Sequence, residues 1–258
     1  MATIAENIQT LRSIKSDIKN AIIQKGGSVT DAFGTYAQAI TNLPSGGGGG
    51  TEIEDAFVTG KLSGTYYNNR VSMVGGYAFY SYSNLTSVNL PNCISVGVNA
   101  FAHCDSLTYV KLLLCKSLMS YAFSNAFLLQ SISLPNCLYV GNAAFAFCST
   151  LKSINLPLCK SFGENLFGEC SAFMYCTGLS IVKIPLCSYI GEYTFRNCIN
   201  LKELYLNSVT SVATISANTF SNCSNLTSVY VPASLFTAFK TAQYWSSISS
   251  KIVVYRGA

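Results

Sequence analysis

The sequence predicts a repeat solenoid of short parallel strands, turns and short helices, preceded by a small N-terminal helical module. Two observations predict the solenoid: phenylalanines recur at a step of 22 residues, and the apolar segments between them keep the same step. A third observation separates the two parts, because five consecutive glycines follow Pro44. The phenylalanines that establish the step are Phe79, Phe101, Phe123, Phe145 and Phe167.

Residues 1–45 are expected to form a helical module for anchoring or oligomerisation. Its apolar residues have helical spacing, which predicts an amphipathic helix that ends near Lys25 and a second short helix from Thr30. A helix pair of this size buries little core by itself. Two interpretations stay open: a minidomain folded on itself or on the solenoid, or a module that self-associates or docks to a larger assembly. The candidate contact residues are Ile4, Ile8, Leu11, Ile18 and Ile22.

Residues 46–51 form a glycine-rich linker, and residues 52–73 are expected to cap the solenoid. Two alternating runs, around Phe57 and Tyr66, flank Ser63 and Gly64 as turn residues. This pattern predicts a hairpin.

Residues 74–231 contain seven copies of the repeat. Each copy has an alternating LxxVxL strand, usually ended by a proline, and a turn where glycine is expected for a positive φ or a close approach. Six extra residues appear around "GECSAFMYC", and the phase resumes at Phe173. One copy cannot bury its apolar side alone, so the copies are expected to stack into one core.

The eleven cysteines fall on two columns of the repeat. Other copies place Tyr82, Ala126 or Val209 in these columns, so the columns are packing sites at which free cysteine acts as a small hydrophobe. No CxxC pair occurs, which disfavours zinc and redox sites. The first column holds Cys104, Cys148, Cys170, Cys176, Cys198 and Cys223, and the second holds Cys93, Cys115, Cys137, Cys159 and Cys187.

Residues 232–258 predict a C-terminal cap, with a helix after Pro232 and then a strand. The residues expected to close the core are Leu235, Phe236, Phe239 and Trp245.

The repeat resembles the BspA-type leucine-rich repeats, whose consensus is IGxxAFxxCxxLxxVxLP. The segments "VGNAAFAFCSTLKSINLP" (140–157) and "IGEYTFRNCINLKELYL" (190–206) carry the resemblance, and "LMSYAFSNAF" (118–127) departs from it. The resemblance implies an open solenoid with a binding role and no catalytic residues.

The N-terminus resembles the short module that opens many tail-fibre-like proteins of phages and prophages. The matching segments are "IKNAIIQKGGSV" (18–29) and "YAQAITNLPSGGGGG" (36–50). The start of the chain has no secretory signal pattern, so a virion location after cytoplasmic synthesis is expected.

Charge and composition narrow the function classes. The formal net charge is +5, but the basic residues are scattered, so nucleic acid and anionic membrane are not expected as partners. No apolar run is long enough to span a membrane. The single histidine, His103, occupies a column that varies like a solvent-facing loop, and it has no partner of catalytic type. We therefore expect no enzyme, no cofactor and no metal.

The outward positions of the strands form two ladders that are candidates for ligand binding. Tyrosine, serine and asparagine in such ladders resemble the chemistry of antibody paratopes, although a merely solvated sheet is the alternative. A loop-side patch was the other candidate, with Tyr66, Tyr67, Tyr80, Tyr82, Tyr121 and Tyr139. The residues selected from the ladders are Asn89, Tyr109, Lys111, Asn155, Lys183, Tyr205 and Tyr230.

The leading functional hypothesis is a non-enzymatic virion protein of tail-fibre or tail-tip type that binds a host-surface protein or glycan. Its N-terminus would join it to other virion proteins, as a homo-oligomer with a trimer favoured, which turns weak contacts into avidity. The alternatives are a structural fibre or decoration protein without a ligand, and a bacterial surface adhesin of BspA type.

Overall fold

The computed structural model describes residues 63–162 and 171–257, which belong to one compact unit. The predicted helices of residues 1–45, the linker 46–51 and the run around Phe57 lie outside the described residues, as do Gly163, Phe167 and Cys170.

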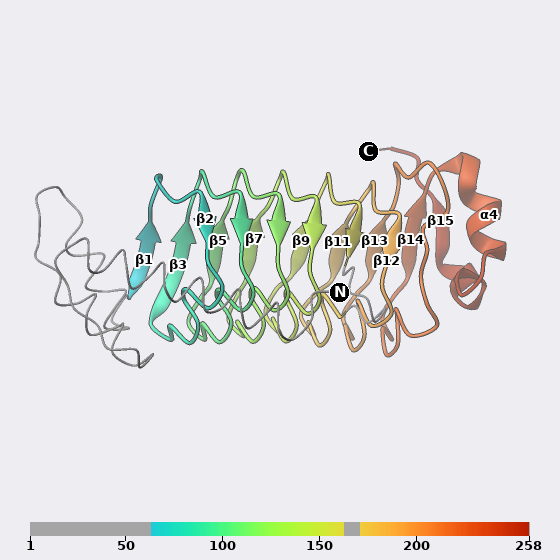
Figure 1. Ribbon diagram of the computed structural model, residues 1–258. Coiled ribbons are helices and arrows are strands. Elements are labelled where there is room, and N and C mark those ends of the chain that lie inside the picture. Colours follow the sequence, from blue (N-terminus) through green and yellow to red (C-terminus); the bar gives the residue numbers. More distant parts are fainter. Residues whose placement is uncertain (1–62, 163–170, 258) are drawn as a thin grey trace, which may run out of the picture. The chain divides into compact units, whose positions relative to one another are not determined.

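The described chain is a parallel β-solenoid, as the repeat predicted, with one row of strands along each of two sides (Figure 1). Every strand pairing among the described residues is parallel. The first row comprises β1 (Gly64–Tyr67), β3 (Leu85–Asn89), β5 (Tyr109–Lys111), β7 (Ser131–Ser133), β9 (Ser153–Asn155), β11 (Ile181–Lys183), β13 (Glu203–Tyr205), β14 (Ser228–Val231) and β15 (Ile252–Val254). The second row comprises β2 (Met73–Val74), β4 (Ser95–Val96), β6 (Ser117–Leu118), β8 (Tyr139–Val140), β10 (Ser161–Phe162) and β12 (Tyr189–Ile190).

A third side, the turn side, carries the AFxxC part of each copy. Backbone hydrogen bonds join neighbouring coils here too: the amide of His103 donates to Ser124 O at 2.9 Å and that of Tyr121 to Asn142 O at 2.8 Å. The chain reaches these partners by adopting a positive φ at two columns, the first including Tyr77, Asn99, Tyr121 and Ala143. The second column comprises Ser81, His103, Asn125, Phe147, Tyr175, Asn197 and Asn222.

The repeated glycines serve close approach rather than positive φ. A Cβ on Gly97 would lie 2.5 Å from the backbone nitrogen of Gly76, and one on Gly141 would lie 2.6 Å from that of Ser120. Neither glycine has a positive φ, because the left-handed positions fall on the turn-side columns instead.

The core contains a stack of phenylalanine rings, with one ring from each coil. Their centroid separations are 4.7 Å for Phe79–Phe101 and 5.2 Å for Phe145–Phe173. Phe173 is therefore the ring next to Phe145, although Phe167 keeps the 22-residue step. The stack continues through Phe195 to Phe220, beside which Trp245 of the C-terminal cap lies at 5.8 Å.

The ten described cysteines are buried and free, as predicted for packing residues. Their thiols also make a specific interaction that the sequence did not suggest. In the first column each thiol donates to the carbonyl of the phenylalanine one coil earlier, as Cys148 Sγ does to Phe123 O at 3.2 Å and Cys176 Sγ to Phe145 O at 2.9 Å. In the second column each thiol donates within its own coil, as Cys137 Sγ does to Tyr139 O.

The N-terminal end differs from the hairpin that we predicted. Gly64 is the first residue of β1 rather than a turn residue, and β1 pairs in parallel with β3, so that Tyr66 faces Val88 in the register. Tyr66 is buried because it contacts the ring of Phe79 at 5.3 Å and so begins the core.

The C-terminal cap follows the predicted order of helix and strand. It comprises η1 (Ala233–Leu235), α4 (Phe236–Thr241), η2 (Trp245–Lys251) and β15. Phe239 and Trp245 are buried, and the indole of Trp245 donates to Ala213 O at 2.6 Å. Leu235 and Phe236 are half-buried, so two of the four predicted residues close the core fully.

Replacement of a central ring should destabilise the solenoid strongly. Phe123 stacks between Phe101 and Phe145, so we expect Phe123→Ala to lower the free energy of unfolding by about 3–5 kcal/mol in urea denaturation. The matched control is Phe127→Ala, because Phe127 is 42% exposed, and it should cost less than about 1 kcal/mol. Equal effects of the two substitutions would contradict the stack as a source of stability.

The buried thiols should make the fold sensitive to alkali. Burial raises the pKa of Cys104 and of Cys137 to about 12, whereas a thiol in the unfolded chain ionises near about 8.5. Their contribution to stability is therefore complete below about pH 8.5 and is lost as the pH rises towards 12, by up to about 1.4 kcal/mol per pH unit and thiol.

Urea denaturation in reducing buffer from about pH 7 to about pH 10 measures this loss. Cys148→Ala is the control, because Ala126 occupies the same column and shows that alanine fits there. The variant should lose less stability with rising pH than the wild type, and identical slopes would contradict the assignment.

Candidate functional site

The first row of strands presents the predicted ladders in register. Asn89 pairs with Lys111 between β3 and β5, and Tyr109 pairs with Ser131 between β5 and β7. Further along the chain, the ladder runs from Asn155 through Lys183 and Tyr205 to Tyr230. The inward residues between them, such as Val110 and Leu204, are buried. The alternation in each strand thus sets these side chains on the outer face.

The C-terminal end of this face carries a compact group, the tyrosine cluster, formed by Lys183, Glu203, Tyr205, Tyr230 and Tyr255. The rings of Tyr205 and Tyr230 stack with centroids 4.5 Å apart. The ammonium of Lys183 lies 5.4 Å from the centre of the Tyr205 ring. Tyr255 meets both tyrosines edge-on at 6.2 and 6.3 Å. The cluster therefore offers flat aromatic area beside one cation and one carboxylate.

A hydrogen bond holds the central ring of the cluster in place. The phenol of Tyr205 donates to Glu203 Oε2 at 2.9 Å. Burial, together with this hydrogen bond to the carboxylate, raises the pKa of Tyr205 to about 12. Tyr205 is thus a neutral donor at physiological pH, with its proton committed to Glu203. Its ring face remains the part available for contacts.

Comparison with known sequence families decides the family. The description of the matching family is "BspA type Leucine rich repeat region (6 copies)", and it matches residues 52–172 and 169–254. The chain belongs to the BspA-type leucine-rich repeat family. The family supports a ligand-binding or adhesin-like role for this BspA-type chain.

Solved structures of leucine-rich repeat proteins resemble this BspA-type chain. A leucine-rich repeat protein of T. pallidum is 23% identical with a TM-score of 0.56, covering 70% of this chain and 85% of that one. A leucine-rich cell surface protein of Faecalibacterium prausnitzii is 26% identical with a TM-score of 0.49, covering 62% of this chain and 43% of that one. The pneumococcal vaccine antigen PcpA is 20% identical with a TM-score of 0.46, covering 75% of this chain and 42% of that one.

These structures agree with the leucine-rich repeat fold of this chain. No curated protein matched its sequence.

Not all of the predicted ligand-binding residues of this BspA-type solenoid come together. Asn89, Tyr109 and Lys111 lie on β3 and β5, and the serines of β7 and the strand β9 separate them from the tyrosine cluster. Tyr109 is 41% exposed, whereas the Oδ1 atom of Asn89 is buried and accepts no hydrogen bond from the described residues. The sequence missed Tyr255, because α4 and η2 interrupt the repeat before β15.

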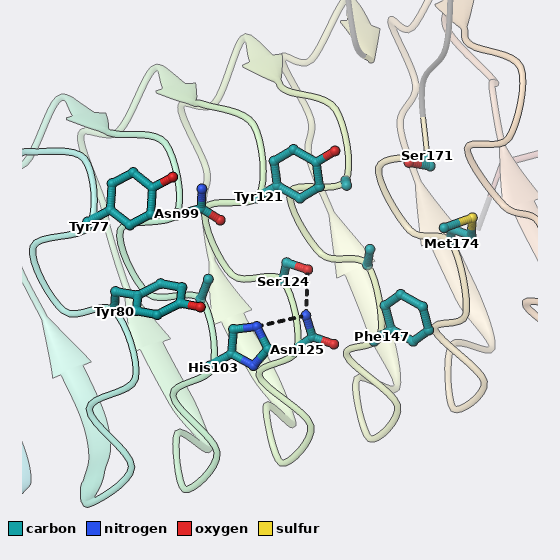
Figure 2. A pocket seen from close by; sticks show the side chains of 13 residues that line it. Tyr77, Tyr80, Asn99, His103, Tyr121, Ser124, Asn125, Phe147, Ser171 and Met174 are labelled. Carbon is teal, nitrogen blue, oxygen red and sulfur yellow. Dashed lines mark hydrogen bonds between the residues drawn. The ribbon is translucent and has the colours of Figure 1, made fainter.

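The predicted loop-side patch is not a single surface. Tyr66 is a core residue and Tyr139 lies in β8 on the second row of strands, whereas Tyr80 and Tyr121 line one groove on the turn side (Figure 2). The sequence could not separate these positions, because tyrosine suits buried and exposed columns equally well.

Two searches bear on other classes of site. Among residues 63–162 and 171–257, no group of three or more histidines, cysteines or acidic residues is arranged to hold a metal ion. Within the same residues, no helix has the length and apolar character needed to cross a membrane.

Proposed function

We propose that this BspA-type solenoid is a non-enzymatic receptor-binding protein that attaches a virion to a protein or glycan on the host surface through the tyrosine cluster. The observation that carries the proposal is the stacked pair Tyr205–Tyr230, flanked by Lys183 and Tyr255 on the outer face. Tyrosine provides a large amphipathic contact area and loses little conformational entropy when a ligand binds. Aromatic residues of this kind dominate the binding energy of many interfaces.

The virion location is supported by the sequence of the first 50 residues. "IKNAIIQKGGSV" and "YAQAITNLPSGGGGG" resemble the module that opens tail-fibre-like proteins. In this arrangement Ile4, Ile8, Leu11, Ile18 and Ile22 join the chain to its own copies, as a trimer, or to other virion proteins. Several copies on one particle would bind a surface with avidity even where each contact is weak.

A second candidate function is a bacterial surface adhesin, which the family itself favours. The two functions use the same solenoid face and differ in what the N-terminal module joins. A structural fibre without a ligand is the third possibility, and it alone predicts that the tyrosine cluster tolerates substitution.

Binding to host cells tests the role of the tyrosine cluster. We expect fluorescently labelled full-length protein to bind host cells and Tyr205→Ser with Tyr230→Ser to weaken this binding about tenfold or more. Serine fits this ladder, because Ser133 occupies it on β7. The matched control is Tyr244→Ala, since Tyr244 is equally exposed but lies in the C-terminal cap. Unchanged binding by the double variant, with its fold intact, would reject this face as the receptor site.

Solution mass tests the role of the N-terminal module. We expect light scattering to give an oligomer for the full chain and a lower mass for the Ile8→Asp, Leu11→Asp variant, because charges on the apolar face oppose helix association. Lys15→Asp is the control for added charge outside that face. A full chain that is monomeric over the whole concentration range would remove the argument from avidity.

A further inference from the structure

A groove on the turn side is separate from the strand face and from its tyrosine cluster. It has a volume of about 340 Å³, within the usual range for small-ligand sites. Figure 2 shows three parallel columns of side chains along it. Tyr77, Asn99 and Tyr121 form one wall, and His103, Asn125 and Phe147 form the other.

Small residues hollow the floor of the groove. Ala102, Ser124 and Ala146 lie in one column between the walls and are all buried. The same column holds larger side chains at both ends, Tyr80 and Met174. The groove is thus a stretch of three coils in which small side chains replace large ones.

The walls present aromatic faces at regular intervals. Tyr77 is 60% exposed and Tyr121 is 42% exposed, and they lie two coils apart, which places them about 10 Å from each other. On the other wall, Phe147 stacks on Tyr175 at 4.8 Å. Both tyrosines have a positive φ, at which asparagine is the more favourable residue, as Asn99 shows. These columns therefore hold aromatic rings where backbone conformation disfavours them.

The polar groups of the groove are neutral hydrogen-bonding groups. Asn125 Nδ2 donates to Ser124 Oγ at 3.1 Å and lies 3.4 Å from His103 Nε2. The lining contains no aspartate, glutamate, lysine or arginine. A ligand of this groove therefore needs flat apolar faces and neutral hydroxyl or amide groups, and it gains nothing from charge.

We propose that this groove is a binding site for a neutral oligosaccharide. A pyranose ring presents C–H faces that stack on tyrosine and phenylalanine, and hydroxyls that pair with asparagine, serine and histidine. A nucleic acid would also stack on the rings, but its phosphates require the lysines and arginines that the groove lacks. A peptide needs a pocket for an anchoring side chain, and the alanine floor provides none.

Two substitutions test the groove, each with a side chain that the same column already accepts. Tyr121→Ala removes one aromatic face, and Ala143 shows that alanine fits the next coil of that column at a positive φ of 52°. Ala146→Met fills the floor without removing a ring, and Met174 shows that methionine fits there. Tyr244→Ala is the matched control, because Tyr244 has a φ of 63° and is 40% exposed, but lies outside the groove.

The probes are the neutral hexasaccharides of cellulose, starch and chitin, measured by isothermal titration calorimetry with the full-length protein. We expect at least one of them to bind with a Kd of about 1 mM or tighter, and Tyr121→Ala and Ala146→Met each to weaken binding about fivefold or more. Tyr244→Ala should change the Kd by less than about twofold. Circular dichroism on each variant confirms that the fold is kept.

Two results would overturn the proposal. One is the absence of binding by all three probes at about 10 mM, and the other is binding that both groove variants leave unchanged, which would place the sugar elsewhere. The double variant Tyr205→Ser, Tyr230→Ser should bind the hexasaccharides as the wild type does. Failure of the groove and failure of the strand face are therefore separate outcomes.

Discussion

The spacing between coils is the constraint on which the rest of this solenoid depends. Parallel strands in register and the backbone hydrogen bonds of the turn side hold successive coils at the distance of neighbouring strands, about 4.8 Å. At this distance equivalent side chains touch, so each column of the repeat becomes a continuous stack. The phenylalanine rings, which lie 4.7 to 5.7 Å apart, occupy one such stack. Ring size and coil spacing agree, which explains why phenylalanine recurs at this position.

The same constraint explains the cysteines better than their hydrophobicity alone. The amide of Phe123 donates to the next coil, and the carbonyl of Phe123 is buried beside the cysteine column of that coil. A thiol is small enough to fit there and donates weakly to this oxygen, as Cys148 does. Alanine fits the space but supplies no donor, and tyrosine is accommodated only at Tyr82, where its ring packs edge-on against Phe79. Because burial also opposes ionisation of the thiol, these cysteines are poor nucleophiles and poor metal ligands.

The periodicity of the sequence was sufficient to predict the solenoid, the register of both ladders and the two buried faces of each coil. It was not sufficient where two solutions share the same step. Phe167 lies 22 residues after Phe145, and Phe173 lies 22 residues before Phe195, so the sequence placed a ring from this copy but could not say which one stacks. The left-handed positions were hidden for a different reason. Glycine was expected there, but inter-coil hydrogen bonds stabilise a positive φ at Asn99, Tyr121 and Phe147.

The candidate sites follow a simpler rule, which the sequence reveals only in part. Tyr205 and Tyr230 occupy one ladder on successive strands, so their stacking follows from the repeat. Tyr255 joins them from outside the repeat, and no periodic argument finds it. The groove was missed because its signal is the absence of bulk: Ala102, Ser124 and Ala146 are unremarkable residues until the walls on both sides are known.

Separation of the columns also gives the solenoid freedom to change its ligand. The core columns hold phenylalanine, leucine and cysteine in nearly every coil, and each contact with the next coil depends on them. The outer ladders and the groove walls vary from tyrosine to serine, asparagine, alanine and lysine without a change in the backbone, since the hydrogen bonds between coils come from main-chain atoms. A change of ligand therefore costs little stability, whereas a change in the core affects every coil that stacks on it. A fold of this kind suits a surface that must recognise different partners.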